Sequence, residues 1–113
     1  MLKVMWFLKR AEGLSLQEFT SWWEEHLHMI AERQKPQLVK YTVNIRTSDD
    51  DNWAGKPVAD CEWDGVAEQW FSSEEAFEAV YGRPTASESR EDTLAHVSRF
   101  ERIVVEELEI PII

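Results

Sequence analysis

The stretch from Leu14 to Lys35, LSLQEFTSWWEEHLHMIAERQK, constrains the fold more than any other part of the chain. Ser15 followed by Glu18 forms a capping-box pattern, in which the serine oxygen accepts a hydrogen bond from the Glu18 amide and the glutamate accepts one from the serine amide. Pro36 cannot continue a helix. The sequence therefore predicts a helix of about five turns that begins after Ser15 and ends before Pro36.

One histidine falls on the apolar side of this predicted helix. His26 lies on the apolar stripe, whereas His28 falls on the polar side. Burial lowers the pKa of an imidazole and favours its neutral form, which can act as a base. His26 is therefore either a general base or a core residue whose ring finds a hydrogen-bond partner, and the helical spacing leaves both alternatives open. The apolar residues of the stripe, which recur at three- and four-residue steps, are Leu16, Phe19, Trp22, Trp23, Leu27 and Ile30.

Length and composition limit what the chain can bind. At 113 residues it is expected to form a single domain, residues 1–113, with one modest core. Six tryptophans are many for such a core, so we expect some of the rings to line a ligand cavity or a subunit interface. The net charge of -10 argues against nucleic acid and anionic membranes as partners, because both select basic patches.

The cysteine content and the start of the chain predict a compartment. Cys61 is the single cysteine and lies between Asp60 and Glu62, which should keep the thiol protonated and inert. The opening MLKVMWFLKR has too short an apolar run for a signal peptide or a spanning helix. Together these features predict a soluble cytoplasmic protein.

Alternating and apolar segments predict four strands and a second helix. Ser72 or Ser73 can cap this helix, which should end at Gly82 and Pro84, while residues 85–98 suit either a short helix or a loop. The order strand, helix, strand, strand, helix, strand predicts an α+β, ferredoxin-like βαββαβ domain with both helices on one face of an antiparallel sheet. The expected strands are residues 2–10, 38–46, 65–71 and 100–110.

The other sheet face is left without helices in this prediction. Because the strands are apolar on both faces, we expect that face to pack against a second copy of the chain, giving a twofold homodimer. The polar segment 47–63 carries Asp49, Asp50 and Asp51 in a run, which is typical of solvated charge rather than of a metal site. Trp53 in the same segment is expected to dock on a surface, its own or the partner's.

Five segments are spread over nearly the whole chain: LKR, GLSLQEFTSWWEEHL, PQLVKY, DGVAEQWFSSEEAF and IVVEELEI. Together they resemble the EthD family of dimeric α+β barrel proteins. Within that family the chain is similar to the methylmuconolactone isomerases, small enzymes that rearrange lactones in the breakdown of aromatic rings. The resemblance implies a cavity between the sheet and the long helix, with the helix histidine pointing into it.

The resemblance assigns roles to individual residues and shows one departure. His26 occupies the position of the helix histidine, and Tyr41 matches the tyrosine that begins the second strand. In the lactone isomerases the third strand offers a cysteine to the cavity, but here that position is Gln69. An amide can orient a carbonyl or donate to an oxyanion, yet it cannot exchange a proton, so the isomerase reaction itself does not follow from the resemblance.

The leading hypothesis is a cofactor-independent isomerase or lyase, without metal, acting on a small cyclic carbonyl compound such as a lactone, a polyketide or an aromatic-catabolism intermediate. His26 would move the proton, while Tyr41 and Gln69 would hold the developing oxyanion. For each tryptophan, packing in the core or at an interface is the alternative, and for His96 a position on the surface. The candidate substrate-binding residues are Trp6, Trp22, Trp23, Phe71 and His96.

Two further hypotheses remain open. The same barrel superfamily includes cofactor-free monooxygenases that oxidise phenols directly with oxygen, and such an enzyme would consume oxygen with a hydroquinone. A non-catalytic dimer that binds a hydrophobic metabolite would instead show ligand-quenched tryptophan fluorescence without turnover. A haem protein is disfavoured, because the chain offers a candidate imidazole but no independent haem signature.

Overall fold

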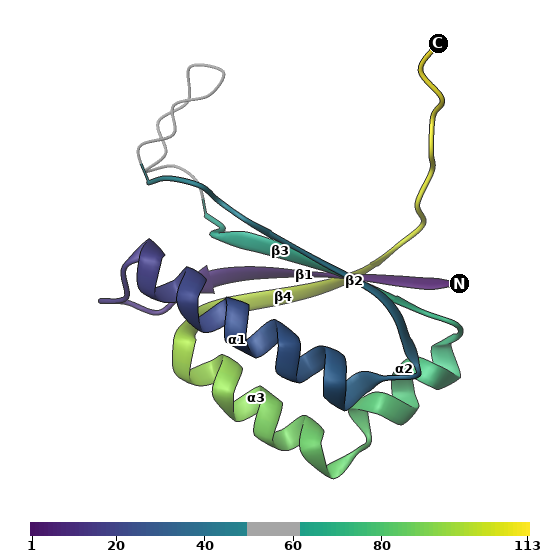
Figure 1. The fold of residues 1–113 in the computed structure, drawn as a ribbon, viewed down its shortest axis with the longest axis horizontal. Helices are drawn as coiled ribbons and strands as arrows, with labels where there is room; N and C mark the ends of the chain where they lie inside the picture. Colours follow the sequence, from purple (N-terminus) through teal and green to yellow (C-terminus); the bar gives the residue numbers. More distant parts are fainter. Residues whose placement is uncertain (50–61) are drawn as a thin grey trace.

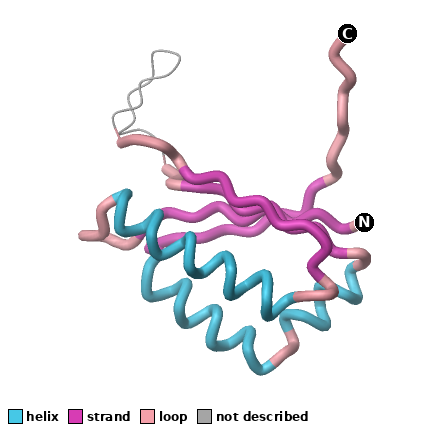
Figure 2. Tube along the Cα trace, in the orientation of Figure 1, coloured by secondary structure: helices cyan, strands magenta, loops and turns pink. Residues whose placement is uncertain are grey.

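Residues 1–49 and 62–113, the part described by the computed structural model, form four strands in one antiparallel sheet and three helices that lie on one side of it (Figures 1 and 2). The strand order β2-β3-β1-β4 is that of the ferredoxin-like fold, so the predicted α+β class is confirmed. In chain order the elements are β1 (Leu2–Arg10), α1 (Leu16–Gln34), β2 (Leu38–Ile45), β3 (Gly65–Phe71), α2 (Glu74–Tyr81), α3 (Pro84–His96) and β4 (Val97–Val105).

The long helix α1 begins and ends where its sequence predicts. The Glu18 amide donates to Ser15 Oγ at 3.0 Å, and the Ser15 amide donates to the Glu18 carboxylate at 3.1 Å, which completes the capping box. His26 is buried on the stripe that faces the sheet, and His28 is exposed. The buried residues of α1 are Phe19, Trp23, His26, Ile30 and Gln34.

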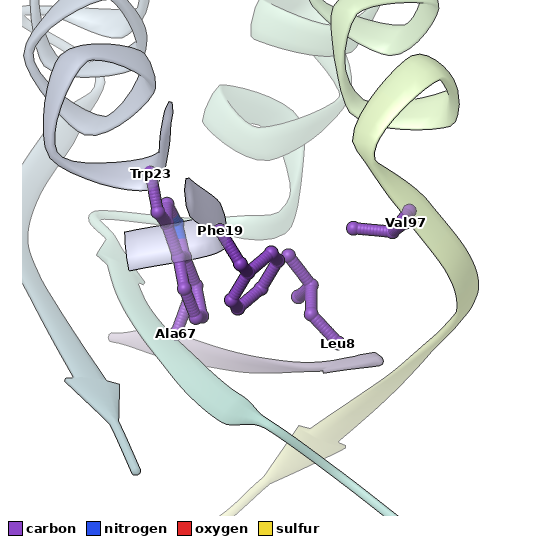
Figure 3. Packing of buried hydrophobic residues seen from close by; sticks show 5 residues of the cluster. All are labelled: Leu8, Phe19, Trp23, Ala67 and Val97. Atoms are coloured by element: carbon purple, nitrogen blue, oxygen red, sulfur yellow. The ribbon is translucent and has the colours of Figure 1, made fainter. Parts of the chain in front are cut away.

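The main core forms where α1 crosses the sheet, as Figure 3 shows. Phe19 and Trp23 of the helix pack against Leu8 of β1 and Ala67 of β3. The indole of Trp23 lies so close to β3 that a Cβ atom at Gly65 would overlap the ring and a backbone oxygen of β2. A residue without a side chain is therefore required there, and this close approach positions the middle of α1, with His26, over the sheet.

The connection from β3 to β4 contains two helices. Gly82 caps the end of α2, and a second helix, α3, begins at once with Pro84 in its first turn. Proline suits that position, because its fixed φ matches the helix and its missing amide hydrogen has no partner there. Of residues 85–98, whose state the sequence left open, 85–96 are thus helical and the last two begin β4, and α3 lies beside α1 (Figure 1).

The last strand is shifted toward the amino terminus from its predicted position of 100–110. β4 begins at Val97 opposite Arg10, and Val105 lies opposite Lys3, near the start of β1. The strand therefore ends opposite the second residue of β1. Residues 106–113 leave the sheet and run away from the helices (Figure 1).

The polar connection between β2 and β3 lies mostly outside the described residues. Asp49 is described, and its carboxylate pairs with the Arg10 guanidinium at 2.9 Å. Asp50, Asp51, Trp53 and Cys61 fall outside, so the interpretations of the aspartate run, of the tryptophan and of the thiol stay predictions. Among the helices that the structure describes, none is both long and apolar enough to cross a membrane.

Candidate active site

A cavity of about 750 Å³ lies between the sheet and the helices that cover it. Cavities of this size hold small-molecule ligands, and such sites combine apolar walls with a few polar groups. Leu8 and Phe100 of the sheet and Ile30 of α1 belong to the apolar wall. Three hydrogen-bonding side chains that the sequence singled out also line the cavity, namely His26, Tyr41 and Gln69.

The predicted substrate-binding residues divide into two groups. Trp6 and Trp23 line the cavity. Trp22, Phe71 and His96 are not among the described residues that line it: Phe71 packs in a separate core cluster with Val4 and Val80, while Trp22 and His96 stack on each other with ring centroids 4.7 Å apart. The structure therefore gathers His26, Tyr41, Gln69, Trp6 and Trp23 around one space.

His26 forms a close pair with a carboxylate of α3. Its Nδ1 lies 2.6 Å from Oδ2 of Asp92. A carboxylate at this distance accepts the Nδ1–H and thereby directs the lone pair of Nε2 to the other side of the ring. The partner could not be found from the sequence, because Asp92 stands in the segment whose structure was left open and no spacing rule links it to a residue of the first helix.

The second nitrogen of the imidazole has a weaker contact. Thr93 Oγ1 lies 3.3 Å from Nε2 of His26, and the Thr93 hydroxyl donates to the Ser89 carbonyl at 3.0 Å. Because that hydroxyl proton is already used, Nε2 of the neutral ring keeps a free lone pair. When the ring is protonated, its Nε2–H can donate to Thr93 Oγ1, so both protons of the imidazolium have acceptors.

Burial and charge act on the titration of His26 in opposite directions. Burial lowers the pKa of His26 below its usual value, while the hydrogen bond and the charge of Asp92 raise it, and the nearby His96 and Arg33 lower it slightly further. The net result is a lowered pKa, so the ring is neutral at neutral pH. A neutral, oriented imidazole on a cavity wall is equipped to accept a proton.

Trp22 and His96 support the pair instead of touching the cavity. The Trp22 indole N–H donates to the same Asp92 oxygen at 3.1 Å, and the His96 Nδ1 lies 2.8 Å from the Asp92 backbone oxygen. The Trp22 ring also lies beside the His26 ring, with centroids 4.7 Å apart. These contacts fix both the carboxylate and the plane of the imidazole.

Gln69, whose side chain is buried, is the centre of a second hydrogen-bond network. Its Oε1 accepts from the Trp6 indole at 2.9 Å and from the Tyr81 hydroxyl at 3.1 Å. Its Nε2 donates to Gln34 at 2.8 Å. Because an indole nitrogen can only donate, these contacts fix which end of the amide is oxygen. One N–H of Gln69 remains for a ligand, whereas its oxygen is occupied.

Two tyrosines that line the cavity keep their protons. Burial raises the pKa of Tyr41 far above its usual value, and the nearby Tyr81 adds to this, against a hydrogen bond with Trp23. Burial also raises the pKa of Tyr81, against the hydrogen bond with Gln34 and the charge of Arg102. Both hydroxyls are therefore donors at neutral pH. Tyr81 was missed from the sequence, since its place on α2 suggested only an apolar contact.

The family of the chain follows from its sequence over most of its length. The sequence model of the EthD domain matches residues 11–100. The chain belongs to the EthD family. A search of curated protein sequences found no match.

Solved structures with the fold of this EthD chain cover nearly all of it. An EthD family protein from Bacillus halodurans has a TM-score of 0.71 and 14% identity, covering 96% of this chain and 99% of that one. A dimeric ferredoxin-like protein of unknown function from Bacteroides fragilis has a TM-score of 0.67 and 10% identity, covering 94% and 95%. SnoaB, a cofactor-independent oxygenase from Streptomyces nogalater, has a TM-score of 0.62 and 16% identity, covering 96% and 93%. At such identities the likeness shows the shared fold alone.

The EthD match includes the helix that carries His26 and the strand that carries Gln69, whereas Trp6 and Arg102 of the cavity lie outside the matched range. Within the described residues there is no group of three histidine, cysteine, aspartate or glutamate side chains placed to hold a metal ion.

Proposed function

We propose that this EthD chain is an enzyme that needs no cofactor and uses general acid–base catalysis to isomerise or eliminate a group from a small cyclic carbonyl compound. The observation that supports the proposal most is that His26, on the wall of a largely apolar cavity, has its Nδ1 2.6 Å from Oδ2 of Asp92. Water is displaced from such a cavity when a ligand enters, which strengthens the effect of each polar group that remains.

The chemistry assigns a separate task to each group. Nε2 of His26 removes a proton from a carbon beside the carbonyl, and the imidazolium that forms is stabilised by Asp92 through Nδ1–H. Negative charge moves onto the carbonyl oxygen, where the Tyr41 hydroxyl and the remaining N–H of Gln69 can donate to it. Return of the proton to a different carbon gives an isomer, and return to a departing oxygen gives an elimination.

The proposal extends the resemblance to methylmuconolactone isomerases only in part. A lactone is the first substrate class to test, because it offers a cyclic carbonyl with an acidic neighbouring C–H. Gln69 replaces the cysteine of those isomerases and cannot transfer a proton. We therefore assign all proton transfer in this chain to His26.

The test compares two histidines of the same helix. His26→Gln and His28→Gln remove one imidazole each, the first beside the cavity and the second in solvent. Turnover of a panel of muconolactones and other unsaturated lactones should fall by about 10²- to 10⁴-fold in His26→Gln, which is the usual contribution of a positioned acid–base group, and stay unchanged in His28→Gln. Equal turnover in both folded variants would contradict the proposal.

A second candidate function is a cofactor-free oxygenation of a phenol. The structural likeness to SnoaB, a cofactor-independent oxygenase, favours it. His26 would then remove a phenolic proton, and the electron-rich anion would react with oxygen. Oxygen uptake with a panel of hydroquinones that disappears in His26→Gln would support this function, whereas isomer formation without oxygen uptake would support the first. Ligand binding without either reaction would indicate a binding protein.

We further propose that the chain pairs into a homodimer through the open face of its sheet. A structural relative with the same fold is dimeric. Adjacent residues of a strand point to opposite faces, so Ile103 lies on the open face because Arg102 lines the cavity on the helix side. Ile103 is 46% exposed and lies opposite Met5 in the sheet. Apolar side chains on this face would be covered by a second sheet.

A further inference from the structure

The arginines of this acidic chain fall into two groups. Arg10, Arg33, Arg46 and Arg99 each lie within 4.0 Å of an aspartate or glutamate oxygen. Arg83, Arg90 and Arg102 have no such carboxylate among the residues that the structure describes. These three are also the arginines that line the cavity. In a chain of net charge -10, the described arginines without an acidic partner are thus collected at one place.

The described part of the cavity wall contains no acidic side chain to balance the charge of these three arginines. None of its described lining residues is an aspartate or a glutamate. Asp92, which contacts His26, is not among the lining residues, and its Oδ2 accepts hydrogen bonds from His26 and Trp22. The first turn of α3, which also lines the cavity, has no acidic residue and presents the positive end of the helix dipole.

Two of the arginines are held in place by uncharged neighbours. The Arg83 guanidinium donates to the backbone oxygen of Arg33 at 2.6 Å and to the side-chain oxygen of Gln37. Arg102 lies over the rings of Trp6 and Phe77, at 5.7 Å and 5.3 Å from their centroids. Neutral acceptors and aromatic faces orient a guanidinium without cancelling its charge. The positive charge at the cavity is therefore available to a ligand.

We propose that this cavity binds a ligand that carries an oxyanion, a carboxylate or a phosphate, on an apolar ring, with Arg102 and Arg90 holding the oxyanion and the aromatic wall holding the ring. The inference rests on the proposed function for the location of the site, and it adds the charge of the substrate. A guanidinium presents paired N–H donors that match the two oxygens of such a group. The ring would then extend toward His26.

The test measures binding, independently of turnover, by isothermal titration calorimetry on the full chain. The probes are benzoate, 2-naphthoate and phenyl phosphate, each beside a neutral analogue: benzamide, 2-naphthamide and phenol. At least one anion should bind about tenfold or more tightly than its neutral analogue, as expected for charge-assisted hydrogen bonds, and its affinity should fall with added salt. Comparing the affinities of phenyl phosphate and benzoate decides whether the site prefers a phosphate or a carboxylate.

Three charge-removing variants locate the site. Arg102→Gln and Arg90→Gln should each weaken binding of the preferred anion by about tenfold. Arg99→Gln is the matched control, because it removes the same charge from β4 at a residue that pairs with Glu101 and does not line the cavity. Arg83 is not substituted, since its contacts hold the end of α1.

The results separate this inference from the proposed function. Equal binding of anions and neutral analogues, an Arg99→Gln loss as large as that of Arg102→Gln, or no saturable binding of any of the three anions would each overturn it. His26→Gln should keep the preference for the anion while losing turnover. A wild-type chain that prefers the anion but catalyses nothing would retain the charged site and contradict only the proposed catalysis.

Discussion

At the scale of residues, the contacts of the two ring nitrogens of His26 decide what the site can do. Asp92 orients the ring from one side, and Thr93 leaves Nε2 with a free lone pair on the other. Catalysis by this base requires the neutral ring. The rate should therefore follow the fraction of His26 that is unprotonated.

The pH dependence of kcat/KM should show that activity increases as His26 loses its proton. Because the pKa of His26 is lowered from 6.5, activity should be low in acid, rise as pH increases through that lowered pKa, and level off above it. Asp92 raises the pKa of His26, so Asp92→Asn should move the rising limb to lower pH and reduce the plateau. A limb that lies above pH 6.5, or one that Asp92→Asn leaves in place, would show that a different group titrates.

Some of these residue contacts could be predicted from the sequence and some could not. Helical spacing was enough to predict that His26 is buried and His28 exposed, because both lie on one regular element. It could not provide Asp92, which comes from a helix 66 residues away in the chain. It also could not show that the oxygen of Gln69 is saturated, since Trp6 and Tyr81 meet it only through the packing of β1 and α2 on β3.

At the scale of elements, the helices differ in how much of their stability comes from residues within the helix and its caps. α1 carries a capping box, an apolar stripe and a terminating proline, so its limits were predictable. α3 has one buried residue, Ser89, and is held to α1 by side-chain contacts such as Arg33 to Ser89 at 3.0 Å. Such long-range contacts leave no periodic pattern in the sequence, which explains why residues 85–98 were left open.

The cap of α2 provides a test with a matched control. The sequence offered Ser72 or Ser73, and in the structure Ser73 Oγ accepts from the Ala76 amide at 3.1 Å, while Ser72 is exposed. Ser73→Ala should lower the free energy of unfolding by about 1 kcal/mol, the usual cost of losing a cap. Ser72→Ala should change it by less than about 0.5 kcal/mol. Urea denaturation measures both, and equal losses would mean that Ser73 does not act as the cap.

At the scale of the whole molecule, the two faces of the sheet have different surroundings. The helix side holds the cavity with its unbalanced arginines, whereas the open side combines apolar residues with paired charges. On that open side Lys3 contacts both Glu68 and Glu107 at 2.9 Å and lies over the Trp70 ring. Sequence alternation predicted that both faces would be partly apolar, but it could not show which charges are balanced, because partners come from different strands and from the tail.

Two neighbouring residues of β4 test whether the open face is the dimer interface. Ile103 lies on the open face and Val104 on the helix side, and they are 46% and 59% exposed. A glutamate at position 103 would bury its charge against the partner sheet, which is costly, so Ile103→Glu should shift the chain toward monomer at micromolar concentration in sedimentation velocity. Val104→Glu adds the same charge on the opposite face and should sediment as a dimer. A monomeric wild-type chain, or a dimer that survives Ile103→Glu but not Val104→Glu, would exclude this interface.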